Sequence, residues 1–135
     1  MYKILNKNTI LNTTTNTNIP IDVNNTDYQD YLKWSENNNQ AQKDKTYKEI
    51  VFELNTAIIN LLDIKAAEKN YTNAVSLTSY INSTNSVWKS EAEKFTKWRD
   101  EVYLYAYDIY LKIEKNNITE INVSDFVKNA PKLVW

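Results

Sequence analysis

The chain has 135 residues, enough for one sizeable hydrophobic core and too few for two. Its net charge of −1 argues against a dedicated nucleic-acid binder, because no basic surplus is available to neutralise phosphates. It contains no His, Cys or Gly, so Ser-His-Asp and Cys-His catalysis, the usual zinc sites and glycine-rich phosphate loops lack their residues. We therefore expect no catalytic residues, no cofactor and no metal. No apolar run is long enough to predict a membrane span. The first ten residues lack the apolar region of a signal peptide.

The absence of glycine leaves asparagine as the residue for turns that need a positive φ. Asparagines occur wherever a break between elements is expected. They are Asn6, Asn8, Asn37–Asn39, Asn70, Asn85, Asn116 and Asn117.

Residues 1–23 are predicted to be extended, with a hairpin turn around residues 6–8 and then a weak strand or ordered loop. A helix is predicted over 24–36, because Asn24 and Asp27 have the spacing of a capping box. The polar stretch that follows this helix is predicted to be a linker. Residues 1–40 are therefore interpreted as an attachment segment, and 41–135 as a separate helical part.

The clearest predicted helix covers 47–69, where Thr46 and Glu49 form a capping-box signature and Asn70 is a plausible stop. Its apolar positions follow helical spacing. They are Ile50, Leu54, Ala57, Leu61 and Ile64.

A shorter helix is predicted over 72–82, a second long one over 86–115, and one helical turn over 124–128. The apolar positions of the second long helix again repeat every three or four residues. They are Trp88, Ala92, Phe95, Trp98, Val102, Tyr105 or Ala106, Ile109 and Ile113. The predicted fold is mainly α, a small N-terminal extended or β element followed by an up–down–up helical bundle with two long helices.

The short middle helix suggests that the second half of the last long helix projects beyond its neighbours. That half contains four tyrosines, Tyr103, Tyr105, Tyr107 and Tyr110. We expect residues 1–36 or another chain to cover them. Core or inter-subunit packing is the favoured interpretation, and a carbohydrate platform is the alternative.

The apolar positions of this helix form an apolar seam, and Arg99 lies beside it, between Phe95 and Val102. This position suggests either a contact with a partner or a side-chain stem packed on the core. In the second case Glu68 is a candidate for its ion pair. Acidic residues on this helix lie at mixed faces, so a solvated surface is favoured over a two-carboxylate hydrolase. They are Asp100, Glu101, Asp108 and Glu114.

Residues 19–39 carry a pattern in which Ile-Pro-x-Asp leads into an Asn-x-Asp-Tyr-Gln-x-Tyr-x-x-Trp helix. This pattern resembles a segment of short bacteriophage tail-fibre, tail-fibre-assembly and tail-accessory proteins. The matching positions are Pro20, Asp22, Asn25, Asp27, Tyr28, Gln29, Tyr31 and Trp34. The glycine of that family's closing turn is replaced here by Asn37–Asn39.

Residues 65–113 are similar to a helical region near the C-termini of phage tail-fibre-type proteins, which ends in Trp-Arg-Asp. Here Lys69-Asn70-Tyr71 replaces the family's Arg-Gly-Tyr. The matching positions are Tyr80, Ser83, Asn85, Glu91, Ala92, Trp98, Arg99 and Asp100. The segment 121–135 resembles the short helix and proline that usually follow.

The resemblance implies a non-catalytic structural protein of the virion, in the tail region, that binds tail, adaptor or fibre subunits and self-associates. The alternatives are an assembly chaperone absent from the mature particle and a receptor-binding protein that holds a host glycan on exposed aromatic rings. The residues expected to make the contacts are Pro20, Asp22, Tyr28, Tyr31, Trp34, Trp98, Arg99, Asp100, Tyr103, Tyr107 and Tyr110.

Overall fold

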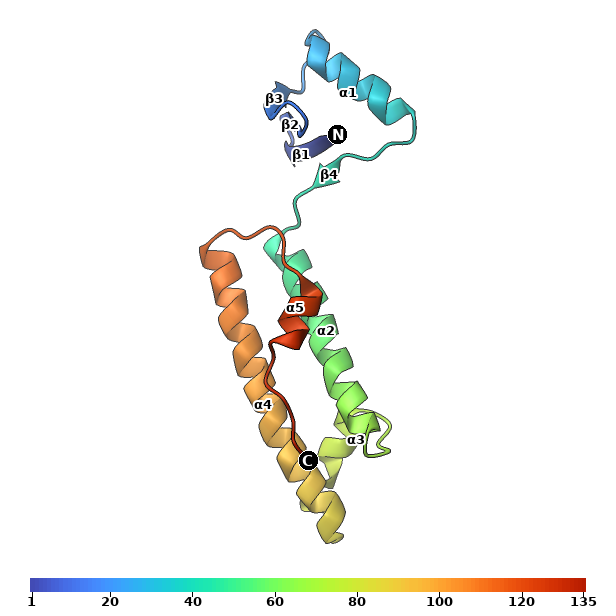
Figure 1. The fold of residues 1–135 in the computed structure, drawn as a ribbon, viewed down its shortest axis with the longest axis vertical. Coiled ribbons are helices and arrows are strands. Elements are labelled where there is room, and N and C mark those ends of the chain that lie inside the picture. The colour runs from blue at the N-terminus through green and yellow to red at the C-terminus, as the bar shows by residue number, and fades with distance from the viewer. The chain divides into compact units, whose positions relative to one another are not determined.

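The computed structural model describes all residues from Met1 to Trp135, and they form two compact units, Met1–Lys45 and Thr46–Trp135. The chain is mainly α-helical with one small sheet, as predicted (Figure 1). The boundary lies five residues after the one predicted at residue 40, because strand β4 (Gln42–Lys43) pairs with β1 and so belongs to the first unit.

The first unit contains a four-stranded sheet in the order β3-β2-β1-β4. Strands β1 (Tyr2–Asn6), β2 (Thr9–Asn12) and β3 (Thr17–Pro20) are antiparallel, whereas β4 is parallel to β1. Ile10 pairs with Ile4 on one side and Ile19 on the other, and Ile10 and Ile19 are the two fully buried side chains of this unit. The predicted hairpin is thus present, and β3 takes the place of the weak strand.

Helix α1 (Thr26–Glu36) begins one residue later than the predicted capping box requires. Asn25, not Asn24, is its N-cap, and the Asn25 side chain accepts a hydrogen bond from the backbone N–H of Tyr28 at 3.1 Å. Just upstream, the Asp22 side chain accepts a hydrogen bond from the backbone N–H of Asn24 at 2.9 Å. The Pro-x-Asp segment therefore shapes the turn that leads into α1.

The second unit contains two long helices, α2 (Tyr47–Ala67) and α4 (Ser86–Lys115), which run in opposite directions along each other (Figure 1). The capping box of Thr46 and Glu49 at the start of α2 is present, as predicted. Between them lie α3 (Ala74–Thr78) and a 3₁₀ turn, η1 (Ser79–Asn82), and α5 (Val123–Lys128) follows α4. The middle segment is shorter than the predicted helix over 72–82. The hydroxyls of Thr78 and Ser79 bond to carbonyls three residues back, an alternative to helical backbone pairing.

The core of this unit lies between α2 and α4, and α3 and α5 also contribute to it. The buried positions of α2 are spaced by four, so the predicted seam is right at its first two positions only. They are Ile50, Leu54, Ile58, Leu62 and Ala66. On α4 the seam is largely as predicted, but Trp88 is exposed and Tyr110 is buried. The buried positions of α4 are Ala92, Phe95, Trp98, Val102, Ala106, Tyr110 and Ile113.

All four residues with positive φ are asparagines, namely Asn16, Asn38, Asn70 and Asn117. Three of them were expected from the sequence, and Asn16 was not. Asn85 instead caps α4, accepting from the N–H groups of Val87 and Trp88. In a chain without glycine, asparagine therefore supplies both the left-handed residues and most helix caps.

Asn70, at φ 66°, ends α2 by letting the N–H of Tyr71 return to the Ala66 carbonyl at 3.2 Å. Asn70→Val should destabilise the second unit by about 1–2 kcal/mol, because a β-branched side chain clashes in this conformation. Asn70→Gly should leave the stability unchanged or raise it slightly. Urea unfolding followed by circular dichroism measures both, and equal stability of the valine and glycine variants would contradict the prediction.

Candidate interaction surfaces

The aromatic residues of the tail-fibre-like motif in residues 19–39 pack on each other and on the sheet of the first unit. The Tyr2 ring of β1 lies 5.3 Å from that of Tyr31 and 5.0 Å from that of Trp34, and Tyr28 stacks on Tyr31 at 5.9 Å. All four side chains are partly buried. Tyr28, Tyr31 and Trp34 therefore hold α1 against the sheet, and only their outer edges are available to a partner.

The exposed part of that motif is the segment between β3 and α1. Pro20 and Asp22 are exposed, and so are the apolar side chains of Ile21 and Val23. The Ile21 N–H bonds to the Asn8 carbonyl at 3.0 Å, which keeps the segment next to the β1–β2 turn. Ile21 and Val23 thus form an exposed apolar surface of the first unit.

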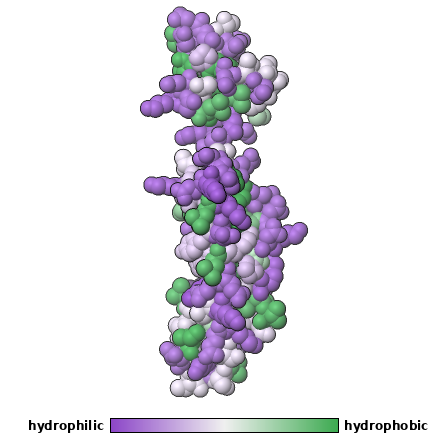
Figure 2. Space-filling view, turned by 90° about the vertical axis from the view of Figure 1, so that its left-hand side faces the viewer, coloured by the Kyte–Doolittle hydropathy of each residue, from purple (hydrophilic) through white to green (hydrophobic).

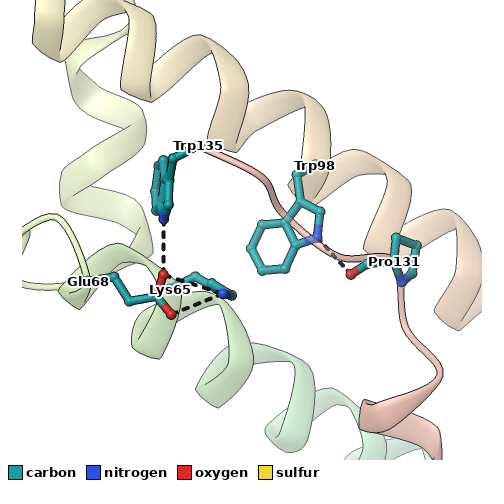
Figure 3. A network of polar contacts seen from close by, with 5 residues as sticks. All are labelled: Lys65, Glu68, Trp98, Pro131 and Trp135. Carbon is teal, nitrogen blue, oxygen red and sulfur yellow. Dashed lines mark hydrogen bonds and ion pairs between the residues drawn. The ribbon is translucent and has the colours of Figure 1, made fainter.

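Trp98 was expected to contact a partner, but it is buried and holds the segment that follows α5 (Figure 3). Its indole N–H donates to the Pro131 carbonyl at 2.8 Å, and its ring packs edge-on against Phe95 at 5.5 Å. We call residues 129–135 the strap. The sequence predicted Trp98 both in the apolar seam of α4 and as a contact residue, and its burial under the strap confirms the seam position.

The far end of the strap is held by Trp135, whose ring stacks on Phe95 at 6.3 Å. Its indole N–H donates to the Glu68 carboxylate at 3.0 Å, and Lys65 forms an ion pair with the same carboxylate at 3.0 Å (Figure 3). Lys69 lies 5.5 Å from the centre of the Trp135 ring. Arg99 does not reach Glu68, so the predicted Arg99–Glu68 pair is wrong.

The hydrogen bond from Trp135, followed by the one from Lys65, lowers the pKa of Glu68 below its usual value. A lowered folded-state pKa contributes stability above the ordinary glutamate pKa, and this contribution is lost as the pH falls. We expect tryptophan fluorescence to change on acidification below pH 4.5 as the Glu68–Trp135 contact weakens. Glu68→Gln keeps an acceptor but cannot titrate, so in that variant the change should be smaller. An identical acid transition in both proteins would refute the link.

The four tyrosines of α4 do not project beyond α2, contrary to the prediction. The Tyr110 hydroxyl donates to the Asn55 side chain in the first half of α2 at 2.7 Å, and that of Tyr105 donates to the Phe126 carbonyl of α5 at 2.8 Å. Burial raises the pKa of Tyr110 to about 12. The second unit thus covers Tyr105 and Tyr110 itself, because α4 lies beside α2 over this length.

Tyr107 is exposed and Tyr103 is partly buried against the core, and both lie on the opposite side of α4 from Tyr105. Their rings form a chain with Tyr110, at centroid distances of 6.3 Å and 6.0 Å. Tyr103 also borders a hollow of about 150 Å³ between α2, α3 and α4. The hollow is lined by Ile59, Leu62, Asp63, Ala74, Val75, Thr78, Arg99 and Tyr103.

The charged groups of this hollow are already engaged. Arg99 donates two hydrogen bonds to Oδ1 of Asp100, at 3.0 Å and 2.8 Å, and Asp63 accepts from the N–H of Ala74 at 2.9 Å. The walls are otherwise mainly apolar.

Several exposed apolar residues were not identified from the sequence. On α4 they include Leu104 and Leu111, which flank Tyr107, and on α2 they include Phe52 and Ile59. Their spacing could have identified them from the sequence, because the two residues of each pair are seven positions apart and lie off the buried seam. In Figure 2 the hydrophobic side chains of the second unit appear as separate green patches among purple hydrophilic ones.

The structure brings no three acidic residues together as a metal-binding group. No helix is both long enough and apolar enough to cross a bilayer. No protein-family model, curated protein or solved structure matches this chain. The resemblance to phage tail proteins therefore rests on the sequence of residues 19–39, 65–113 and 121–135 alone.

Proposed function

We propose that this chain is a non-catalytic structural component of a bacteriophage virion, in the tail region, which binds neighbouring virion proteins. The observation that carries the proposal is the set of large apolar side chains exposed on the second unit. A residue of this kind in isolation is ordinary, but several on the same helix side are typical of a protein-binding surface. On α4 they include Leu104, Tyr107 and Leu111, and on α2 they include Phe52 and Ile59.

The first unit supports an attachment role. Its tail-fibre-like motif builds a small, aromatic-braced unit, and the motif's Pro-x-Asp segment presents Ile21 and Val23 at the surface. Apolar side chains in a well-ordered turn lose little conformational entropy on binding. We propose that this segment contacts a tail, adaptor or fibre subunit.

The residue chemistry supports a role other than catalysis. The chain has no His or Cys, and the carboxylates of α4 include two engaged with basic neighbours. Asp100 pairs with Arg99, and Asp108 pairs with Lys112 at 3.5 Å. Paired carboxylates on a helix surface are the usual solvated arrangement.

The finer architecture belongs to the same proposal. We treat α2, α3 with η1, and α4 as an up–down–up bundle with two long helices, to which α5 and the strap add a cover. In this arrangement the side of α4 away from α5 is the one offered to other subunits, including further copies of the chain.

The test is peptide mass spectrometry of purified infectious particles, with the copy number measured against the major capsid protein. We expect a fixed copy number, small relative to the capsid protein, as for a tail component. Absence from particles combined with abundance in infected cells would overturn the structural role in favour of an assembly chaperone. A copy number close to that of the capsid protein would overturn the tail location.

The sugar-binding alternative is tested separately by glycan-array binding of the purified chain. The Tyr103–Tyr107 pair, of which Tyr107 is the exposed member, is the surface that would serve it, so Tyr107→Ala is the variant to compare. We expect no specific glycan signal for either protein. A signal that the substitution abolishes would instead support receptor recognition.

A further inference from the structure

Helix α4 carries an exposed apolar stripe made of Leu104, Tyr107 and Leu111. These side chains are 69%, 58% and 64% exposed, although each is large and apolar or aromatic. Their spacing of three and four residues places them along one side of the helix. Tyr105 and Trp98, which hold α5 and the strap, lie on a different side. The stripe is therefore not used by the packing of the second unit itself.

Charged residues continue the stripe at both ends. Asp100 lies one helical turn before Leu104, and Lys115 lies one turn after Leu111. The stripe thus has an acidic end and a basic end, with apolar side chains between them. Both Arg99 hydrogen bonds go to Oδ1 of Asp100, which leaves Oδ2 for a second cation.

The order of these residues is symmetric about the midpoint between Tyr107 and Asp108. Leu104 and Leu111 lie at equal distances along the sequence from that midpoint, and so do Asp100 and Lys115. A second helix of the same sequence, running antiparallel, would therefore set leucine against leucine and Asp100 against Lys115. This is the self-complementarity that a twofold interface requires.

We propose that a second copy of this chain packs its α4 antiparallel against this stripe, about a twofold axis between Tyr107 and Asp108. The inference rests on the proposed function, for which it names a partner of the exposed surface. A parallel arrangement would place Asp100 on Asp100 and Lys115 on Lys115 of the two copies, and like charges in register are destabilising. Charge complementarity thus selects both the occupant and its direction.

Sedimentation equilibrium of the full chain gives the primary test, with Leu111→Lys compared with Ile64→Lys. Both substitutions place a lysine where the native side chain is 64% exposed, but Ile64 is on α2 and outside the stripe. We expect the native chain to be dimeric. Leu111→Lys should weaken the dimer by roughly tenfold or more, because it introduces one charge per copy into an apolar contact, and Ile64→Lys should not.

A charge exchange tests the antiparallel pairing. Asp100→Lys sets lysine against Lys115 of the other copy, and Lys115→Asp sets aspartate against Asp100, so each variant should dissociate more readily. The double variant restores opposite charges and should recover most of the lost affinity. Circular dichroism checks that each variant keeps its helix content.

A monomeric native chain at all concentrations measured would overturn the inference. So would a dimer that Ile64→Lys weakens as much as Leu111→Lys, or a double variant that is weaker than both single ones. These outcomes leave the proposed function intact if the chain is still found in particles. Conversely, a dimer of a chain that is absent from particles would overturn the virion role without affecting the interface.

Discussion

Replacing Phe95 by alanine should destabilise the second unit by about 3–5 kcal/mol. Phe95 is fully buried in the core between α2 and α4. Its ring contacts both Trp98 and Trp135, so its loss leaves a cavity and also removes the surface on which the strap rests. Urea unfolding followed by circular dichroism measures the change, because most helical residues of the chain belong to this unit and so dominate the signal.

Phe52→Ala is the matched control for that experiment. It removes the same side chain from α2, but at a position that is 72% exposed. Its effect on the free energy of unfolding should be within about 0.5 kcal/mol. Similar losses in the two variants would mean that the exposed and buried sides of these helices have been assigned wrongly.

Trp98→Ala should cost about 3–5 kcal/mol as well, because a large buried ring is removed. Trp98→Phe retains most of the apolar contact and removes the indole N–H that holds the Pro131 carbonyl. It should cost about 1–2 kcal/mol, mainly for the lost hydrogen bond. Comparison of the two variants separates packing from hydrogen bonding at the strap.

Limited trypsin digestion measures the strap directly, since Lys132 lies within it. Cleavage after Lys132 should be faster in Trp98→Phe than in the native chain, whereas cleavage within α2 should be unchanged. If Trp98→Phe is as resistant as the native chain, the Trp98–Pro131 bond does not hold the strap. Such a result would reopen an interaction role for Trp98.

The α2 seam shows where prediction from periodicity stops. Ile50 and Leu54 were identified correctly, but the sequence allowed either Ala57, Leu61 and Ile64 or Ile58, Leu62 and Ala66 as its continuation. α2 is apolar around much of its circumference, so spacing alone could not choose. The choice follows from the position of α4, which packs along the second set.

Packing, and not residue type, also decides which tyrosines of α4 are buried and which are exposed. Tyr105, Tyr107 and Tyr110 are close in sequence, yet one is covered by α5, one is exposed and one is bonded to α2. Their spacing did predict that they face different directions around the helix. Which of those directions is covered depends on the position of α2 and on the path of residues 118–135 over the unit.

The sequence by itself determined the helical class, the hairpin, the capping box of α2, the full extent of α4 and the use of asparagine at positive φ. These features depend on local physical chemistry, on helical periodicity, on capping side chains and on the absence of glycine. The tertiary structure alone decided which residues continue the α2 seam, the strap over Trp98 and the exposure of Leu104 and Leu111. Each of these depends on contacts between residues far apart in the chain, which no local pattern specifies.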